Sequence, residues 1–308
     1  MSSFDAIAIK SDFSIPQNQQ DNCVSSCNLI WRQRKLLVNL FPQFKQPYMS
    51  SLDNQQRLTE CLQRSPIQLI RLDHNLSETQ IRLWADASHQ AKKSVYLKLP
   101  AAESIAKQRR SFSWFFKRCS DWLAASVLLL LVMPLMVFLS LLVCFSSPGP
   151  IFFRQWRVGE RGKLFQIYKF RTMVVDAEKL HHQVMANQSG LHKLVDDPRL
   201  TPIGAWMRKY SLDELPQLFN VLRGEMSLVG PRPWALYDAI RLSGEGKKRL
   251  NAIPGITGAW QVQARSNLLD INAVNNLDLI YLHNWSLTTD LMILLQTFPK
   301  VLSGFGAF

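Results

Sequence analysis

Two adjacent carboxylates, Asp213 and Glu214, are the residues that the sequence best equips for chemistry. They follow a short predicted helix, TPIGAWMRKY, and stand in the motif SLDELPQLFNVLRGE. Ser211 and Glu214 match the S-x-x-E capping box, which predicts that both acids lie in the first turn of a second helix. Pro216 fits the same turn, because a proline deeper in a helix would break it. The positive end of the helix dipole would then favour the ionised form of both carboxylates.

Acids in a first helical turn are most often simple capping residues. Here the surrounding segment favours a catalytic role over a capping role, because it is rich in cations: Lys169, Arg171, Arg199, Arg208, Arg223 and Arg232. Phosphoryl transfer requires cations around the phosphates, a divalent metal and a positioned nucleophile. An ionised aspartate can attack phosphorus and form an acyl phosphate, which divides one transfer into two steps. The combination favours phosphoryl-transfer chemistry.

The overall composition is consistent with that chemistry. The chain has 308 residues, 47% of them hydrophobic, and a formal net charge of +13. Such an excess of positive charge predicts an anionic partner, which could be a nucleic acid, an anionic membrane surface or a phosphate-rich substrate. The five cysteines form no CxxC pair, so we expect reduced thiols in a chain that folds in the cytosol. The N-terminus lacks the features of a secretory signal.

One segment is apolar enough to enter a membrane. The run Trp122–Phe145 is almost wholly apolar, and as a helix it would be about 36 Å long, sufficient to cross a bilayer. Pro134 stands near its centre, where it deletes a backbone hydrogen bond. Each half would be about 18 Å long and would reach only the middle of the bilayer.

Both flanks of this segment are basic: Lys107, Arg109, Arg110, Lys117 and Arg118 precede it, and Arg154, Arg157, Arg161 and Lys163 follow it. A spanning helix would keep only one basic flank in the cytosol, so two basic flanks predict that both ends stay on the cytoplasmic side. We therefore expect a helix over about 119–147 that is broken at Pro134 and re-enters the same leaflet. The alternative is a kinked span with a translocated C-terminal domain.

The remaining chain divides into three parts. Residues 1–34 are rich in Ser, Gln and Asn near their start and are expected to be mobile. Residues 35–106 alternate strand-like and helix-like patterns, with Ser77 as a helix cap, and predict a small α/β module with a parallel sheet. It has no Gly-rich phosphate loop, and its role cannot be read from the sequence. Residues 107–308 are expected to form a membrane-anchored α+β domain that is mainly helical, with a polar helix and loop over 176–195.

Several motifs in this last part resemble a known family, the bacterial sugar transferases that are called monotopic phosphoglycosyl transferases or polyprenyl-phosphate sugar-1-phosphate transferases. The resemblance covers roughly 115–308. It is carried in order by KRCSD, the Pro-interrupted apolar run, GPIFFRQWRVG, YKFRTM, DPRLTPIGAWMRKYSLDELPQLFNVLRGEMSLVGPRP, PGITGAWQV and NWSLTTDLMILLQT. It departs from the family at Met133-Pro134, where a Ser-Pro pair is common, and at Ala264-Arg265, where Gly-Arg is common.

The resemblance implies an enzyme that transfers a sugar-1-phosphate from a UDP-sugar to undecaprenyl phosphate, releases UMP and initiates exopolysaccharide or envelope polysaccharide synthesis. Asp213 would be the nucleophile and Glu214 its assistant, and together they would hold Mg²⁺. The other implied site residues are the substrate- and phosphate-binding Arg208, Lys169, Arg171, Asp197, Arg199 and Arg232, and Pro231 and Pro233 on the nucleotide side. The enzyme would lie against inner-leaflet lipids on the cytoplasmic face of the bacterial inner membrane. No nucleic acid is expected, and a homodimer stays open.

Two other classes of function remain as alternatives. An ordinary nucleotide-sugar glycosyltransferase would form a glycosidic bond and release UDP, but such enzymes commonly hold their metal with Asp-x-Asp, which this sequence lacks. A non-enzymatic membrane scaffold or a nucleic-acid binder would account for the charge, and it would tolerate Asp213→Asn. The identity of the sugar and the pathway cannot be read from residue patterns.

Overall fold

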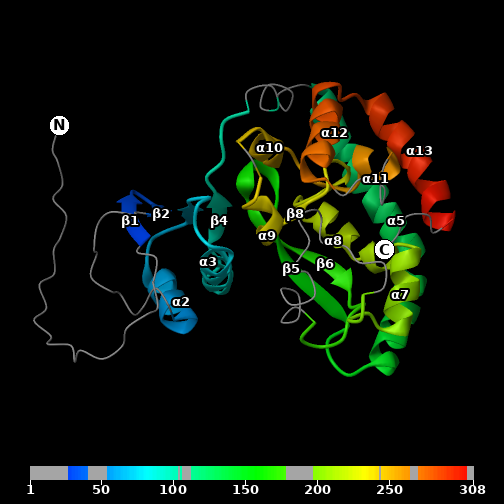
Figure 1. Cartoon of the computed structure of the whole chain (residues 1–308), viewed down its shortest axis with the longest axis horizontal. Coiled ribbons are helices and arrows are strands. Elements are labelled where there is room, and N and C mark those ends of the chain that lie inside the picture. The colour runs from blue at the N-terminus through cyan, green and yellow to red at the C-terminus, as the bar shows by residue number, and fades with distance from the viewer. Residues whose placement is uncertain are drawn as a thin grey trace, which may run out of the picture.

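The computed structural model describes residues 27–40, 54–102, 105, 112–177, 197–242, 244–263 and 270–303. An N-terminal α/β module, within residues 27–102, lies beside a larger domain, within residues 112–303, which is named the catalytic domain after the candidate acids Asp213 and Glu214 that it contains (Figure 1). Within the module, α3 (Glu78–Gln90) and β4 (Ser94–Leu97) are the elements nearest the catalytic domain. The expected polar helix and loop over 176–195 fall almost wholly outside the described residues.

The module contains one four-stranded sheet in the order β1-β2-β3-β4. Strands β2, β3 and β4 are parallel, as the alternating pattern predicts, and β1 pairs antiparallel with β2. β1 occupies residues that were expected to be mobile, and it forms because a tight turn at Gln33 (φ 53°) folds it back along β2. The remaining bounds are β1 (Cys27–Arg32), β2 (Lys35–Leu40), α2 (Gln55–Arg64) and β3 (Leu69–Leu72).

The Ser77 cap of α3 is confirmed. The Ser77 hydroxyl accepts from the Gln80 backbone N–H at 3.3 Å, and the Gln80 side chain accepts from the Ser77 N–H at 3.2 Å. These two bonds satisfy donors that the first turn of a helix otherwise leaves unpaired. Both partners lie within four residues of each other, so the sequence alone could specify them.

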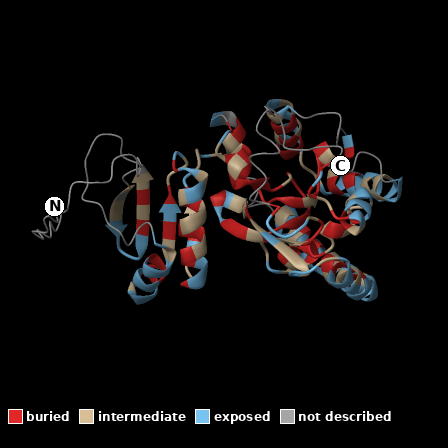
Figure 2. Cartoon of the chain, turned by 60° about the horizontal axis from the view of Figure 1, so that its bottom comes forward, coloured by how far each residue is buried: buried red, intermediate tan, exposed pale blue. Residues whose placement is uncertain are grey.

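The module and the catalytic domain share one hydrophobic core. Ile70, Ile81 and Trp84 of the module belong to the same buried cluster as Trp156 and Trp234 of the catalytic domain. Figure 2 shows buried residues in both parts. The Trp156 indole also donates a hydrogen bond to Asp86 at 2.7 Å. The module is therefore packed onto the catalytic domain.

The catalytic domain is built around small sheets. Strands β6, β5 and β8 form one sheet, and β7 pairs parallel with β9 in a second. The antiparallel β5–β6 pair with its Gly-containing turn matches the sequence prediction. The strands are β5 (Phe152–Val158), β6 (Leu164–Phe170), β7 (Ser227–Val229), β8 (Trp234–Ala235) and β9 (Gly255–Thr257). The helices after α5 are η1 (Glu160–Gly162), α7 (Pro202–Lys209), η2 (Leu212–Glu214), α8 (Gln217–Leu222), α9 (Leu236–Ala239), α10 (Gly244–Lys248), η3 (Arg249–Asn251), α11 (Ala259–Gln263), α12 (Ile271–His283) and α13 (Leu287–Ser303).

Helix α5 (Phe112–Ser146) lies along the catalytic domain and packs against α7, α8 and β7. It continues through Pro134, so the expected break is not confirmed. Among the described residues it is the one helix long and apolar enough to cross a membrane. One seam of the helix is buried, including Ala125, Leu139 and Val143, whereas the rest exposes large apolar side chains such as Leu130.

Both ends of α5 are bound to the same domain. Near its start, Lys117 forms an ion pair with Asp290 of α13 at 2.6 Å, and Asp121 accepts a hydrogen bond from Ser227 at 2.7 Å. Near its end, the Arg171 guanidinium donates to the carbonyls of Ser147, at 2.6 Å, and of Pro148. The same guanidinium lies 3.5 Å from the carbonyl oxygen of Val143, one of the last four carbonyls of α5, which lack intrahelical donors, so this arginine helps to cap the helix.

Candidate active site

Asp213 and Glu214 lie in the 3₁₀ turn η2, directly before α8. The capping box predicted at Ser211 is wrong. Ser211 has a left-handed backbone (φ 55°), and its side chain makes no capping hydrogen bond. Pro216 instead occupies the N-cap position of α8. The two acids thus still precede a helix, but a tight turn and not a capping box sets their direction.

The pair faces a cavity of about 1000 Å³. The Asp213 side chain is almost fully buried, with 6% of the residue exposed. Burial raises the pKa of Asp213 and is the largest influence on it, Glu214 raises the pKa further, and the cations Lys169 and Arg208 oppose the rise. The sequence predicts that the helix dipole favours the ionised form of Asp213, whereas desolvation at this buried position favours the neutral form.

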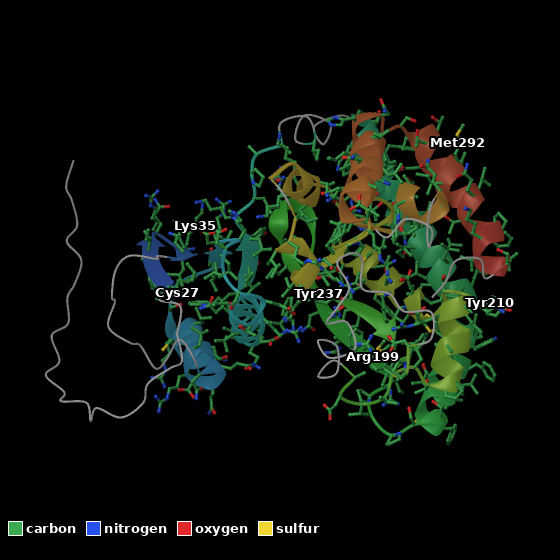
Figure 3. The ribbon with its side chains drawn as sticks, viewed as in Figure 1. Cys27, Lys35, Arg199, Tyr210, Tyr237 and Met292 are labelled. Carbon is green, nitrogen blue, oxygen red and sulfur yellow. The ribbon has the colours of Figure 1, made fainter. Side chains whose placement is uncertain are left out.

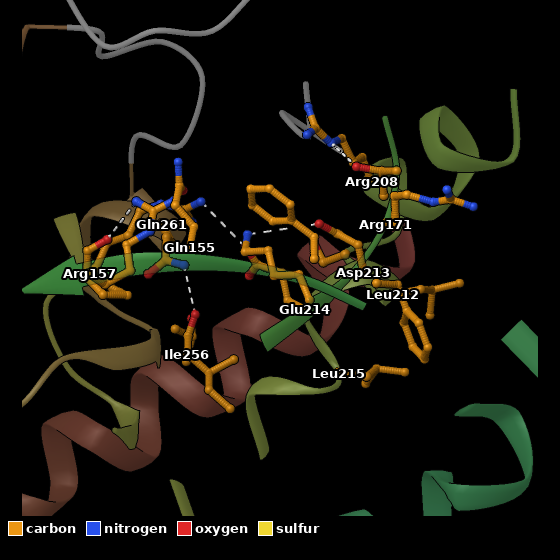
Figure 4. A pocket seen from close by; sticks show the side chains of 18 of the residues that line it. Gln155, Arg157, Arg171, Arg208, Leu212, Asp213, Glu214, Leu215, Ile256 and Gln261 are labelled. Atoms are coloured by element: carbon orange, nitrogen blue, oxygen red, sulfur yellow. Dashed lines mark hydrogen bonds and ion pairs between the residues drawn. The ribbon is translucent and has the colours of Figure 1, made fainter. Parts of the chain in front are cut away.

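Two cations hold Glu214 in place. Lys169 Nζ of β6 lies 2.6 Å from Glu214 Oε1, and Arg232 Nη2 lies 3.4 Å from the same oxygen. Lys169 Nζ also lies 3.9 Å from Asp213 Oδ2. Figure 4 shows Asp213 and Glu214 close to each other among the residues that line the cavity. Positive charge is thus concentrated where a phosphate would meet the Asp213 carboxylate.

Three further predicted residues line the cavity. Arg208 donates from Nε to the Thr172 hydroxyl at 2.9 Å, and this bond fixes its side chain beside the site. Arg199 and Asp197 form a buried two-point ion pair, with Nε–Oδ1 at 2.8 Å and Nη2–Oδ2 at 2.5 Å. The geometry brings all three to the site, but Arg199 and Asp197 neutralise each other there.

Other expectations fit the structure less well. Arg171 lines the cavity, but its guanidinium points away from Glu214 (Figure 4) and donates to carbonyls at the end of α5, so these hydrogen bonds are structural. Arg223 donates to the Tyr168 hydroxyl at 2.6 Å and does not line the cavity. Pro233 lines the cavity, whereas Pro231 does not, and its carbonyl instead accepts from the Gly255 N–H at 2.9 Å.

Sequence reasoning missed several cavity residues. The sequence places Arg157 in the basic flank of the apolar segment and in the motif GPIFFRQWRVG, without a site role, but it lines the cavity and its guanidinium donates to Gln155 Oε1 at 2.6 Å. A signal existed, because alternation along β5 predicts that Gln155 and Arg157 point to the same face. Asp238 also lines the cavity, where burial raises its pKa to about 6. Nothing local in the sequence marks Asp238.

Asp213 and Glu214 are two candidate ligands for a metal ion. Among the described residues, no group of three or more His, Cys, Asp or Glu side chains could bind a metal ion. Mg²⁺ commonly takes one or two carboxylates and completes its shell with water and substrate phosphates. The adjacent Asp213 and Glu214 match that reduced donor set.

A family model covers the region that contains this site. The family model described as "Bacterial sugar transferase" matches residues 112–304, which include the acids and every cation that surrounds them. The chain belongs to the bacterial sugar transferase family. The N-terminal module lies outside the matched region.

Curated relatives of this bacterial sugar transferase carry related names. "Galactosyl transferase CpsE" of Streptococcus agalactiae is 46% identical over 162 residues, which cover 52% of this chain and 36% of that protein. "Undecaprenyl-phosphate galactose phosphotransferase" of Salmonella typhimurium is 41% identical, covering 64% of this chain and 42% of that protein. "Exopolysaccharide production protein ExoY" of Rhizobium meliloti is 40% identical, covering 62% of this chain and 88% of that protein. The chain thus spans less than half of the first two relatives and most of the third.

Proposed function

We propose that this bacterial sugar transferase moves a sugar-1-phosphate from a UDP-sugar to undecaprenyl phosphate, releases UMP and so initiates exopolysaccharide or envelope polysaccharide synthesis. The main support for this proposal is the buried Asp213 carboxylate, which faces one cavity together with Lys169, Arg208 and Arg232. The name of the Salmonella relative supports the same reaction, and the name of the Rhizobium relative supports a part in exopolysaccharide production.

The cavity suits a donor that is charged and an acceptor that is a lipid. One side carries the cations, and another is lined by apolar residues of the long helix α5, including Leu128 and Val132. A polyprenyl phosphate needs both environments, because its tail stays in hydrocarbon while its phosphate must meet the nucleophile. An enzyme with a wholly soluble acceptor would have no need for this apolar wall.

The reaction proceeds in two steps. The ionised Asp213 carboxylate attacks the β-phosphorus of the UDP-sugar, the bond from that phosphorus to the bridging oxygen breaks, and UMP leaves. A phosphate oxygen of undecaprenyl phosphate then attacks the phosphorus of the aspartyl intermediate and regenerates the carboxylate. Lys169 and Arg232 keep Glu214 beside the nucleophile, and Arg208 offers positive charge to the phosphoryl oxygens.

Magnesium is part of the proposal. Asp213 and Glu214 would share one Mg²⁺ with the donor diphosphate, and the ion would neutralise charge that develops on the leaving phosphate. Dependence of UMP release on added Mg²⁺, with loss in chelator, is the direct test of this requirement.

We also propose that α5 inserts into the inner membrane from its cytoplasmic face and keeps both ends on that side, which requires the helix to bend at Pro134 in the membrane. The contacts of Lys117 and Arg171, one near each end of α5, support this because they tie both ends to a single folded domain. A crossing helix would have to break one set of contacts. Exposed apolar side chains on α13, namely Leu291, Met292, Leu295 and Phe298, would add a second contact with the same leaflet; Figure 3 shows Met292 at the outer side of that helix.

Cysteine labelling tests this topology. In a cysteine-free background, an Arg154→Cys variant places one thiol on the exposed strand residue that follows α5. A membrane-impermeant reagent should label it in inverted vesicles and not from the periplasmic side of intact spheroplasts. Efficient periplasmic labelling would mean that α5 crosses the membrane completely.

A UMP-release assay tests the function. The full chain in membranes that contain undecaprenyl phosphate should release UMP from at least one member of a UDP-sugar panel, and Asp213→Asn should abolish turnover, because an amide is a poor nucleophile. Asp270→Asn is the matched control, since Asp270 is an exposed N-cap outside the cavity and asparagine caps a helix equally well. Without acceptor, the wild type should give one equivalent of UMP and a sugar-phosphate-labelled protein.

The same assay separates the alternatives. Release of UDP would indicate an ordinary glycosyltransferase. The name of the Streptococcus relative, a galactosyl transferase, is also consistent with that class. Full activity of the Asp213→Asn variant in cells would indicate a scaffold without catalysis. Strictly sequential kinetics with no burst would remove the covalent intermediate from the mechanism.

A further inference from the structure

The N-terminal module reaches the active-site cavity. Its helix α3 packs against α9 of the catalytic domain. Two polar contacts fix the arrangement: Asp86 accepts from Trp156 at 2.7 Å, and Tyr96 forms an antiparallel backbone bridge with Lys163. Figure 3 shows Tyr237 of α9 on the side of the catalytic domain that faces the module. This placement makes α3 part of the surroundings of the site.

Arg82 of α3 lines the same cavity as Asp213. Its guanidinium forms an ion pair with Glu78, one helical turn away, at 3.0 Å. Glu78 in turn helps to raise the pKa of both Tyr237 and Asp238, although burial is the main cause of each rise. The first two turns of α3 are therefore electrically coupled to α9 across this end of the cavity.

Asp238 lines this end of the cavity, and one oxygen of its carboxylate lacks a hydrogen-bond donor among the described residues. The residue is 7% exposed, and its Oδ1 atom is buried without a hydrogen-bond partner among the described residues. Its ion pair with Arg241 is long, with Nη1–Oδ1 at 4.0 Å. A buried acceptor without a hydrogen bond is costly, and a hydroxyl donated by a ligand would remove that cost.

Polar residues connect Asp238 to the nucleophile. Arg157 influences the pKa of Lys169 beside Asp213 and also that of Asp238. Its guanidinium is held by Gln155 and by the Pro233 carbonyl at 3.2 Å. A donor whose phosphorus lies at Asp213 would therefore extend one of its sugar rings along a surface of hydrogen-bonding groups.

We propose that Asp238 and Arg82 form a subsite for ring hydroxyls of the donor, so that the N-terminal module supplies the outer wall of the donor site and helps to set donor specificity. The inference rests on the proposed function, because it requires a nucleotide-sugar donor. Hydroxyls of this kind occur on the transferred hexose and on the ribose, and the two sources are separable by experiment. Asp238 accepts from the hydroxyl, and Arg82 donates to a neighbouring oxygen.

The test compares donors across variants of the full chain. UMP release is measured for the wild type, Asp238→Asn, Arg82→Gln and the matched control Arg71→Gln, which makes the same change at an exposed residue of β3 outside the cavity. The donors are the preferred UDP-sugar, its C4 epimer, its deoxyhexose analogues and its 2′-deoxyuridine analogue. Thermal unfolding of every variant checks the fold.

We expect Asp238→Asn and Arg82→Gln to lower kcat/KM for the preferred donor by about tenfold or more, as for a hydrogen bond to a charged group. For each variant, the loss should vanish with the analogue that lacks the hydroxyl bound by the wild-type side chain, which identifies the hexose or the ribose as the source of that hydroxyl. An equal loss with every donor, or no loss beyond that of Arg71→Gln, would overturn the proposal. If the wild type itself releases no UMP from any donor, the proposed function fails first.

Discussion

A buried ion pair behind the active site carries the sharpest prediction. Arg249 Nη2 and Asp278 Oδ2 lie 2.6 Å apart, and each side chain is 1% exposed. The same guanidinium donates to the Arg232 carbonyl at 2.8 Å and lies 4.8 Å from the Trp234 ring centroid. Burial raises the pKa of Asp278, and Arg249 opposes that rise. The pair is thus both a structural contact and a support for the backbone of Arg232.

Arg249→Met removes the cation and leaves the Asp278 carboxylate buried. Breaking one partner of a buried pair typically costs about 3–5 kcal/mol, whereas replacing both partners by apolar residues is often neutral. We therefore expect the single variant to lose about 3–5 kcal/mol of unfolding free energy. The double variant Arg249→Met/Asp278→Leu should recover most of that loss.

Activity should not recover in the same way. Without the guanidinium, the Arg232 carbonyl loses its donor, and the Arg232 side chain loses the backbone position from which it reaches Glu214 at 3.4 Å. A small misplacement of a positioning group can cost about 100-fold in rate. The stable double variant should therefore show a lower kcat with little change in KM.

Thermal unfolding in detergent and UMP release together check this prediction. The reasoning is refuted if Arg249→Met is within about 1 kcal/mol of the wild type, which would mean that the buried charge is tolerated. It is equally refuted if the double variant regains both stability and full turnover, because Arg232 would then need no support from Arg249.

Three other predictions follow from single contacts. The pKa of Asp238 is raised from 3.8 to about 6, so ionisation of this carboxyl destabilises the fold as the pH rises through this range. The Asp238→Asn variant should therefore exceed the wild type in unfolding free energy at pH 7.5 by up to about 3 kcal/mol. This difference should vanish near pH 4, as unfolding measured at both pH values would show. Because burial also raises the pKa of the Asp213 nucleophile, wild-type UMP release should fall on acidification at a higher pH than an ordinary aspartate would give, which a pH–rate profile measures. Lys117→Met should lower the unfolding temperature strongly, since it leaves Asp290 buried without its cation, at a cost of about 3–5 kcal/mol; an exposed Lys92→Met control should change it little.

Much of the fold followed from local patterns. Strands β2, β3 and β4 and helices α2 and α3 lie where alternating and helical periodicities predict them, because each buries one face of a regular element. The apolar character of α5 was equally plain. The face that it buries was not, because the segment is apolar on every side and only its partners α7, α8 and β7 select one seam.

The capping-box pattern occurs at Ser77 and at Ser211, and only at Ser77 does the local sequence decide the structure. At Ser77 the capping box forms, because nothing competes with Ser77 for the Gln80 side chain strongly enough to open it. At Ser211 it does not, because the Glu214 carboxylate is bound by Lys169 and Arg232 from two other elements. Charge-assisted bonds of this kind are stronger than the neutral cap that they replace.

The sequence by itself determined the chemistry of this protein: two adjacent acids, the cations around them and an apolar segment with basic flanks. The tertiary structure decided which cations serve the site. It brought Lys169, Arg208 and Arg232 to the acids, bound the Arg171 guanidinium to the end of α5, and added Arg157 and Asp238, which the sequence did not predict as site residues. It also placed α3 of the module at the same cavity. Residue types fix what a side chain can do, but packing between distant segments fixes what it meets.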